Sequence, residues 1–541
     1  MTTPDPTPRF FSRENLPRIG AAVFSGAVLK LVSPPIGWDF IHWLTFVPLF
    51  VAVAVPGEAP MEVEGGAVRR RWTQLRAVLR TRNFRLGYLT GFSGVFLLFF
   101  WLAQTIDLFS NIPLVLAALI VALFAAVFGL PYGFLAAAVA PLRRLFGEAW
   151  VFMFATLWVT MEFAQPALFP YYQGVGQYRN PYTWQLASVF GAYGVSWLII
   201  LTNSTAAELW LAWRARRPLP VRALVITLAL FLGNLGFGFW RFNAVEAELH
   251  AAPSARVSLL QQGVTMVDRI QDRGTEVLKS WLTLTAKVAE QHPDLVVWPE
   301  GSIYYNPTEP KVKAGFGQMT KQYGFAFLLG GGTHGPDPAN PTQRANWNSA
   351  YLFGTDGEIK GRYDKMVPMP FGEYLPWPVS YLKPYITGVG SFRAGSDPTV
   401  FRTDKFSFTV PICYEAILEA QMRRLSTADV YVNITNDGWF GDTAAPHQHA
   451  MLAAAYAVEM GRPMLRIAYT GISMVVEPHG VIRYETKPYT EAAEVVELRL
   501  AKFETPYRTW GRAFPYVCTT FTLLMSLLVA LGVVTPRPPR A

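Results

Sequence analysis

Three residues of this chain have side chains that could act together in chemistry: Glu300, Lys365 and Cys413. A free cysteine has a pKa near ~8.5 and attacks other molecules as the thiolate. A neighbouring carboxylate can accept the thiol proton, and an ammonium group can stabilise both the thiolate and a developing oxyanion. The three residues therefore predict a base, an electrostatic stabiliser and a nucleophile.

The chain has only one other cysteine, Cys518, at the start of the apolar run 516–534. A thiol in such a run behaves as a small hydrophobe. We therefore expect no disulfide between the two cysteines, and Cys413 is predicted to be a free thiol.

The elements that must position these residues alternate between short apolar runs and amphipathic segments, which is typical of an α/β fold. Apolar runs of four to six residues bounded by Gly or Pro fit strands that are buried on both faces. Ligand sites in open α/β sheets gather at the carboxyl ends of strands, so we expect Glu300 and Cys413, which each follow a strand, to converge there. Strands are predicted at 255–261, 294–298, 325–330, 348–353, 406–412, 430–434, 472–477, 481–484 and 495–498, and helices at 275–291, 310–323 and 447–460.

Lys365 is selected less directly, because Lys360, Lys383 and Lys405 lie nearby in the sequence. It follows a hairpin-like segment at 353–359 and precedes Phe371-Gly-Glu373-Tyr. Only this spacing favours Lys365 over the other lysines.

The composition indicates a membrane protein, since 51% of residues are hydrophobic and only 16% are charged. A helix needs roughly 20 mostly apolar residues to cross a bilayer. We expect an N-terminal membrane domain over 1–240 with seven spans, a catalytic domain over 241–514, and a last span with a short tail over 515–541. The eight predicted spans are at 17–33, 39–55, 86–106, 112–134, 149–167, 185–213, 220–240 and 515–534.

Arginines predict the orientation, because short loops rich in Lys and Arg stay in the cytoplasm. Arginine clusters precede the first span, follow the second, fourth and sixth spans, and end the chain, whereas the alternate connections carry almost no positive charge. The block 241–514 is therefore predicted to face away from the cytoplasm. The net charge of +9 is then an orientation signal, and nucleic-acid binding is not expected.

Four segments together resemble the nitrilase (carbon-nitrogen hydrolase) superfamily, and more narrowly the apolipoprotein N-acyltransferase family. This resemblance covers essentially the whole chain and implies an αββα sandwich within the membrane architecture. The segments are Trp298-Pro-Glu-Gly, Lys365 followed by Pro368-Met-Pro-Phe-Gly-Glu-Tyr-Leu-Pro, Pro411-Ile-Cys-Tyr-Glu, and Asn433-Ile-Thr-Asn-Asp-Gly-Trp-Phe-Gly.

The resemblance implies acyl transfer in two steps at the outer leaflet of a bacterial inner membrane. Cys413 would take an acyl chain from a phospholipid, typically phosphatidylethanolamine, and pass it to the α-amine of the diacylglyceryl cysteine of an apolipoprotein. Glu300 would be the general base and Lys365 the oxyanion stabiliser, while Glu373, Glu415 and Tyr414 would support the site. Glu373 and Glu415 are expected to orient Lys365 and the incoming amine. The resemblance implies no cofactor or metal, and we expect a monomer.

A thioester must be kept dry until the amine arrives, so apolar cover is expected near the site. Tyr374, Trp439 and Phe440 are predicted substrate contacts or an aromatic anchor at the membrane surface, with ordinary packing as the alternative.

Other polar residues receive structural interpretations. His447 and His449 have no third metal ligand at a suitable spacing, so a capping or surface role is predicted. Glu162, Gln173 and Asn203 could line an access path for lipid or peptide, and polar packing between helices explains them equally well.

Two other functions use the same features. A membrane-tethered amidase would hydrolyse a carbon-nitrogen bond with the same three residues, and it would release product without an acceptor. A transporter with an outer ligand-binding domain predicts charged residues inside the membrane, of which the predicted spans contain few.

Overall fold

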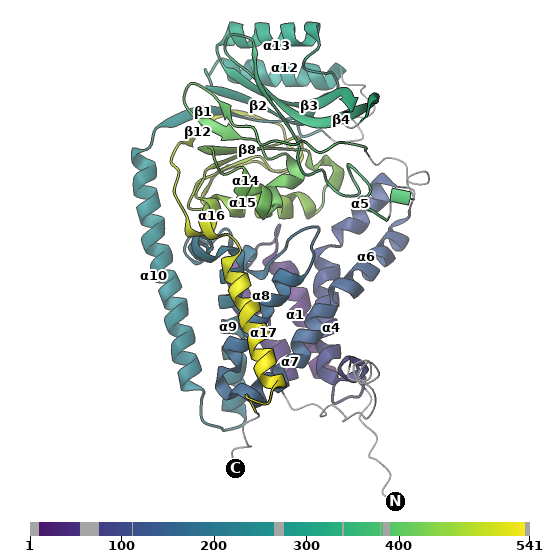
Figure 1. Cartoon of the computed structure of the whole chain (residues 1–541), viewed down its shortest axis with the longest axis vertical. Coiled ribbons are helices and arrows are strands. Elements are labelled where there is room, and N and C mark those ends of the chain that lie inside the picture. The colour runs from purple at the N-terminus through teal and green to yellow at the C-terminus, as the bar shows by residue number, and fades with distance from the viewer. Residues whose placement is uncertain are drawn as a thin grey trace, which may run out of the picture.

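The computed structural model describes residues 10–54, 75–110, 112–264, 275–337, 340–378, 380–381 and 390–535. Apolar helices form one part of the molecule, and two β-sheets with covering helices form the other (Figure 1). Lys383, one of the lysines weighed above, lies outside the described residues.

The helical part alternates long helices with short, broken ones. Its elements are α1 (Leu16–Val32), η1 (Asp39–Leu44), α2 (Val47–Val53), α4 (Arg82–Leu98), α5 (Trp101–Phe109), α6 (Leu114–Phe128), α7 (Leu130–Phe146), η2 (Gly147–Ala149), α8 (Trp150–Ala164), η3 (Gln173–Gln177), η4 (Thr183–Leu186), α9 (Ala187–Arg214), α10 (Val221–Ala251), α16 (Pro506–Trp510) and α17 (Ala513–Ala530).

Several of these helices are suited to a membrane. Among the described residues, four helical stretches are long and apolar enough to cross one: Leu114–Ala164, Thr183–Arg214, Val221–Ala251 and Ala513–Ala530. The pair Arg82–Leu98 and Trp101–Leu108, bent by 43°, makes a fifth if it counts as one span. The predicted count of eight is therefore not confirmed.

The predicted spans differ from the helices where the chain is interrupted. The second predicted span, 39–55, is split between η1 and α2. The fourth predicted span, 112–134, stops too soon, because α7 continues the helical stretch beyond Gly129 to Phe146. Gly129 allows a close approach to α4, since an added Cβ would lie 2.7 Å from the amide nitrogen of Phe92. Hydropathy finds the apolar residues but not the boundary between α6 and α7 at this glycine.

The upper part is a sandwich of two six-stranded sheets, ordered β12-β1-β2-β3-β4-β5 and β11-β10-β9-β8-β7-β6. In each sheet three neighbouring strands are parallel, β1 to β3 in the first and β7 to β9 in the second, and the outer pairings are antiparallel. The strands are β1 (Ser254–Gln261), β2 (Leu295–Ile303), β3 (Ala326–Asp337), β4 (Asn340–Phe353), β5 (Ile359–Asp364), β6 (Phe401–Arg402), β7 (Ser407–Thr409), β8 (Val430–Thr435), β9 (Met464–Ala468), β10 (Met474–Val476), β11 (Ile482–Glu485) and β12 (Ala492–Arg499).

Helices cover both outer faces of this sandwich. Figure 1 shows α12 (Thr275–Ala289) and α13 (Pro310–Tyr323) above the first sheet, and α14 (Glu419–Arg424) and α15 (Ala445–Met460) below the second. The predicted αββα sandwich is confirmed. Strands such as β2 and β8 are buried on both faces, which explains why their sequences are continuous apolar runs.

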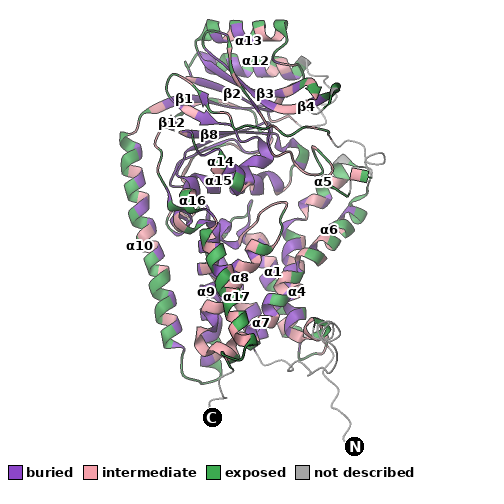
Figure 2. Ribbon diagram, viewed as in Figure 1, coloured by how far each residue is buried: buried purple, intermediate pink, exposed green. Residues whose placement is uncertain are grey.

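The helix α15 joins the sandwich to the helical part, which is called the membrane part from here on. All of its residues except His447 are buried (Figure 2), because it contacts both the second sheet's side of the sandwich and α9. Five alanines among its last eleven residues allow this close packing on two sides. Glu459 Oε1 also accepts a hydrogen bond of 2.8 Å from the amide of Ala192 in α9.

One local prediction was wrong in detail, and one strand was missed. Glu300 lies inside β2 rather than after it, at a bulge where pairing with β3 stops after Trp298 and resumes at Ile303. The strand β9 was not predicted, because its short run Met464–Ala468 contains the charged residue Arg466.

Candidate active site

Lys365 lies between two carboxylates in the buried centre of the site. Its Nζ is 3.3 Å from Oε1 of Glu300 and 2.8 Å from Oε2 of Glu373. Asn348 in β4 joins the two acids, since its Nδ2 donates to Glu300 at 2.6 Å and to Glu373 at 2.8 Å. The structure thus brings together a base candidate, a cation and a second acid from β2, the end of β5 and the segment after it.

The charges of this cluster stabilise one another. Burial lowers the pKa of Lys365, but the neighbouring carboxylates of Glu373 and Glu300 outweigh burial and raise the pKa well above its usual value. For Glu373, burial raises the pKa, but the charge of Lys365 and the hydrogen bonds to the carboxylate lower the pKa by more, so the net shift is downward. Lys365 is therefore a fixed cation and Glu373 a fixed anion.

Cys413 begins the short helix η6 (Cys413–Ile417) and is a buried free thiol. Its φ angle of 50° lies in the left-handed region, which is uncommon for a residue other than glycine. Burial and the negative charge of Glu300 raise the pKa of the thiol, while Lys365 lowers it. A resting thiol in these surroundings is neutral and needs a base to react.

Glu415 is fully buried and positions backbone rather than Lys365. Oε1 accepts hydrogen bonds from the amides of Met366 and Val367, at 2.7 and 3.0 Å, and Oε2 accepts one from the amide of Ile412 at 2.8 Å. Tyr363 and Gln421 donate to Oε1 as well. Burial raises the pKa of Glu415 to about 7 in spite of these donors. One carboxylate thus joins the segment after Lys365 to the residue before Cys413.

The predicted aromatic and supporting residues occupy different environments. Tyr414 is buried, and its hydroxyl donates to the carbonyl oxygen of Leu168 in the membrane part at 2.8 Å. Phe440 is also buried, edge-on to Trp101 of α5 at 5.4 Å between ring centroids. Trp439 and Tyr374 are 50% and 38% exposed, respectively, on the outside of the same region. Phe440 therefore packs against α5, and only the other two are available at the surface.

The predicted surface or capping role of His449 was wrong. The ring is buried, with Nδ1 2.7 Å from Oδ1 of Asp437 and Nε2 3.3 Å from the carbonyl oxygen of Cys413. Arg466 Nη2 donates to the other oxygen of Asp437 at 2.8 Å. Sequence reasoning also missed Asn348 and Arg466. The one sequence signal that could have pointed to Arg466 and His449 was Asp437 in the Asn-Asp-Gly-Trp segment, because this acid needs a buried partner.

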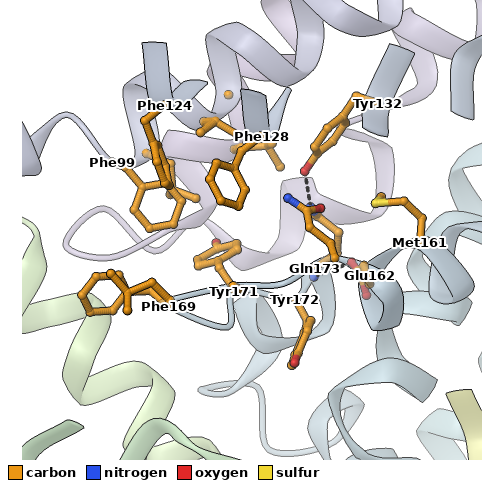
Figure 3. Close-up of a pocket in the computed structure, with 17 residues that line it drawn as sticks. Phe99, Phe124, Phe128, Tyr132, Met161, Glu162, Phe169, Tyr171, Tyr172 and Gln173 are labelled. Carbon is orange, nitrogen blue, oxygen red and sulfur yellow. Dashed lines mark hydrogen bonds between the residues drawn. The ribbon is translucent and has the colours of Figure 1, made fainter. Parts of the chain in front are cut away.

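A cavity that is partly open to the outside lies among the membrane helices next to this site (Figure 3). Aromatic side chains surround it, among them Phe99, Phe128 and Tyr171, and Glu162 and Gln173 lie on one side. Gln173 Nε2 donates to the hydroxyl of Tyr132 at 3.2 Å. The cavity is therefore apolar with a few polar groups at one end.

A smaller cavity shares Phe99, Phe169 and Tyr171 with the first and is also lined by Phe440 and His449. The two cavities are therefore neighbours, the first among the membrane helices and the second beside His449. Asn203 is not part of either cavity lining, and its side chain binds the backbone of Phe46 and His42 instead. Of the three polar residues considered for an access path, Glu162 and Gln173 line the cavity, and Asn203 makes a packing contact.

Within the described part of the chain, one group has the geometry to hold a metal ion: Glu246, Glu477 and His479. The guanidinium of Arg483 already pairs with both carboxylates, at 2.9 and 2.7 Å. Both carboxylates are therefore already paired with a cation of the chain itself.

Residues 257–505 match the carbon-nitrogen hydrolase family, which agrees with the αββα sandwich and the Glu-Lys-Cys cluster. These features define an enzyme of the carbon-nitrogen hydrolase superfamily. Residues 25–205 match the apolipoprotein N-acyltransferase N-terminal domain.

Whole-chain relatives give the narrower family. The apolipoprotein N-acyltransferases of Sinorhizobium medicae and Rhizobium meliloti are each 31% identical over 478 residues, 85% of both chains. That of Geobacter metallireducens is 28% identical over 524 residues, 94% of both chains. The chain belongs to the apolipoprotein N-acyltransferase family, as the sequence motifs predicted.

Proposed function

We propose that this protein transfers an acyl chain from a phospholipid to the α-amine of the diacylglyceryl cysteine of apolipoproteins. The names of its relatives support the acceptor, and the active-site geometry supports the chemistry. The observation that carries the proposal is the buried ammonium of Lys365, held by Glu300 and Glu373 beside the neutral thiol of Cys413.

In the first step, Cys413 Sγ attacks the acyl carbonyl carbon of the phospholipid while Glu300 takes the thiol proton. A carbon-sulfur bond forms, and the carbonyl oxygen becomes an oxyanion next to Lys365, whose charge stabilises it. The ester carbon-oxygen bond then breaks, and Glu300 returns the proton to the leaving oxygen. The products are a lysophospholipid and a thioester on Cys413.

In the second step, the apolipoprotein amine attacks the thioester carbon and Glu300 accepts an amine proton. A carbon-nitrogen bond forms, the carbon-sulfur bond breaks, and the sulfur leaves as a thiolate beside Lys365. Glu300 then passes the amine proton to this thiolate, which restores the resting thiol. Glu373 keeps Lys365 in place through both steps, since its carboxylate contacts Nζ directly. Glu415 supports the site by holding the backbone on either side of it.

Transfer rather than hydrolysis requires that water be excluded from the thioester. The buried position of Cys413 and the packing of Phe440 against Trp101 favour such exclusion. We propose that the two neighbouring cavities hold the acyl chain, because their aromatic lining suits a hydrocarbon and the second is lined by His449, whose ring contacts Cys413. Trp439 and Tyr374 are proposed to contact the substrates at the exposed edge.

The remaining assignments concern the setting of this site. We propose that 1–240 and 515–541 are the membrane parts, with eight passages in total, and that 241–514 is the catalytic domain. The arginine pattern supports a bacterial inner membrane with this domain on the periplasmic side. A monomer that uses phosphatidylethanolamine as donor is the simplest form of the proposal.

Intact mass spectrometry after incubation with a defined phosphatidylethanolamine tests this function. The expected result is a mass gain of one acyl chain on Cys413, which a lipopeptide amine discharges as an N-acylated product. Cys413→Ala should give no adduct and Cys518→Ala a normal one. An adduct that persists in Cys413→Ala would reject the nucleophile, and release of free fatty acid with no dependence on acceptor would indicate a hydrolase.

A further inference from the structure

The backbone on both sides of Cys413 is fixed by side chains from other elements. The carbonyl oxygen of Pro411 accepts from Asn433 Nδ2 at 2.8 Å, and that of Cys413 lies 3.3 Å from His449 Nε2. The amide between them, on Ile412, donates to Glu415. A positive φ at a residue other than glycine is strained and persists only where the surroundings enforce it. The contacts to Pro411, Ile412 and Cys413 hold the backbone of Cys413 in this conformation.

A single buried guanidinium connects two of these contacts. Arg466 Nη1 donates to Asn433 Oδ1 at 2.5 Å, and Arg466 Nη2 donates to Asp437 Oδ2 at 2.8 Å. Asp437 Oδ1 in turn lies 2.7 Å from His449 Nδ1. Arg466 therefore orients both the amide that holds Pro411 and, through Asp437, the imidazole that reaches Cys413.

All four side chains of this network are buried, and its charges are balanced. Asp437, Arg466 and Asn433 are fully buried and His449 is nearly so. Burial disfavours ionisation of Asp437, but Arg466 and His449 hold its pKa at about 2, below the ordinary value. An ionised acid paired this closely does not move independently of its partners.

The same segment also contacts the base. The amide of Asn436, next to Asp437, donates to Glu300 Oε2 at 2.8 Å. A shift of this segment would therefore move the base and the nucleophile at the same time.

We propose that His449 is a positioning residue for Cys413, held by Asp437 and Arg466, and that it sets the direction of the thiol. The inference rests on the proposed role of Cys413 as nucleophile and adds the residues that aim it. The ring contacts the carbonyl oxygen of Cys413, so it acts through backbone geometry rather than by taking the thiol proton. A misplacement of about 1 Å can cost about 100-fold in rate.

Two substitutions of His449 separate its two contacts. The side-chain amide of His449→Gln can place a donor near the position of Nε2 and keep the bond to Cys413. That of His449→Asn reaches only the position of Nδ1, so it keeps Asp437 and loses Cys413. We expect thioester formation to slow by about 100-fold in His449→Asn and by no more than about tenfold in His449→Gln.

The measurement is the rate of acyl-enzyme formation on the full-length protein in detergent, with dioleoyl phosphatidylethanolamine at several concentrations. The expected loss is in the maximal rate, with the half-saturating lipid concentration unchanged. His479→Gln is the matched control, because this histidine is also buried in an ion-pair cluster but contacts Glu246 rather than the active site. It should react at the wild-type rate.

Asn433→Ser tests the same network without changing His449, and it keeps the inference testable if His449→Asn does not fold. It removes the bond to Pro411, and we expect a loss of at least about tenfold. A wild-type rate in a folded His449→Asn, or equal losses in His449→Asn and His449→Gln, would overturn the positioning role. If His449→Asn does not fold, a wild-type rate in Asn433→Ser would overturn it. A wild-type protein that forms no adduct on Cys413 would instead overturn the proposed nucleophile.

Discussion

Glu373 and Glu415 both lie close to Lys365, but their carboxylates bind different donors. Glu373 contacts the ammonium itself, whereas Glu415 accepts five hydrogen bonds from backbone amides and neutral side chains. In all five hydrogen bonds the carboxylate of Glu415 is the acceptor. This acid is therefore a structural acceptor that holds the Lys365 and Cys413 segments together.

The substitution Glu415→Gln tests this role. The new amide group would place its own hydrogens against donors, so we expect a loss of about 1–3 kcal/mol in unfolding free energy and a marked slowing of thioester formation. Thermal unfolding in detergent and the acyl-enzyme rate are the measurements. The exposed Glu504→Gln serves as control, and wild-type behaviour of Glu415→Gln would contradict the assignment.

Sequence reasoning brought forward Glu300, Lys365 and Cys413 because each has a reactive side chain and a recognisable local motif. It missed Asn348, Arg466 and the role of His449, since their contacts come from partners in other strands and helices. Arg466 is the clearest case. Its position in β9 interrupts an apolar run, and its partner Asp437 is far away in the sequence.

Among the elements, α9 shows how local geometry joins the two parts of the molecule. It contains a non-helical residue, Gly191, with φ of 65°. The next residue, Ala192, donates its amide to Glu459 of α15, and Tyr507 of α16 packs directly against Gly191. The kink therefore places the start of α9 against both α15 and α16.

Gly191→Ala should disturb this junction. An added Cβ would lie 2.3 Å from the Tyr507 ring at a φ that non-glycine residues rarely adopt, so we expect a loss of about 1–3 kcal/mol. Gly233→Ala in α10 is the control, since nothing lies within 4 Å of its added Cβ and alanine favours a helix. The unfolding temperature should fall for the first variant only; equal values would contradict the strain.

The regular elements were the most predictable part of the fold. The predicted helix 310–323 has the same bounds as α13, and the strand at 255–261 differs from β1 by one residue. Both have clear periodicity and clear ends. The first span, predicted at 17–33, matches α1 within one residue, whereas the second was less predictable because that apolar segment is divided between η1 and α2.

At the scale of the whole molecule, the proposed acyl-chain cavity lies where the membrane helices meet the sandwich. Val95 of α4 lines it, and Val95→Trp would fill part of the space. We expect acyl-enzyme formation from a dioleoyl phospholipid to fall by about tenfold or more, and that from a dihexanoyl analogue to fall less. Leu119→Trp, at a residue 62% exposed on α6, is the control. An equal effect on both lipids would argue against the cavity.

The proposed orientation can be tested with single cysteines. Ala314 in α13 and Ala215 after α9 are both exposed, and the two native cysteines are buried. An impermeant maleimide should label Ala314→Cys in intact spheroplasts and Ala215→Cys only after permeabilisation. The reverse pattern would place the sandwich on the cytoplasmic side.

The burial of α15 on both sides has a consequence for how the protein can be divided. A fragment containing only residues 241–514 would lose α9, and with it the cover over one face of an alanine-rich helix. Newly exposed apolar surface of that kind promotes self-association. The sandwich is thus not a soluble enzyme carried by an anchor, and excising it would remove part of its own hydrophobic interior.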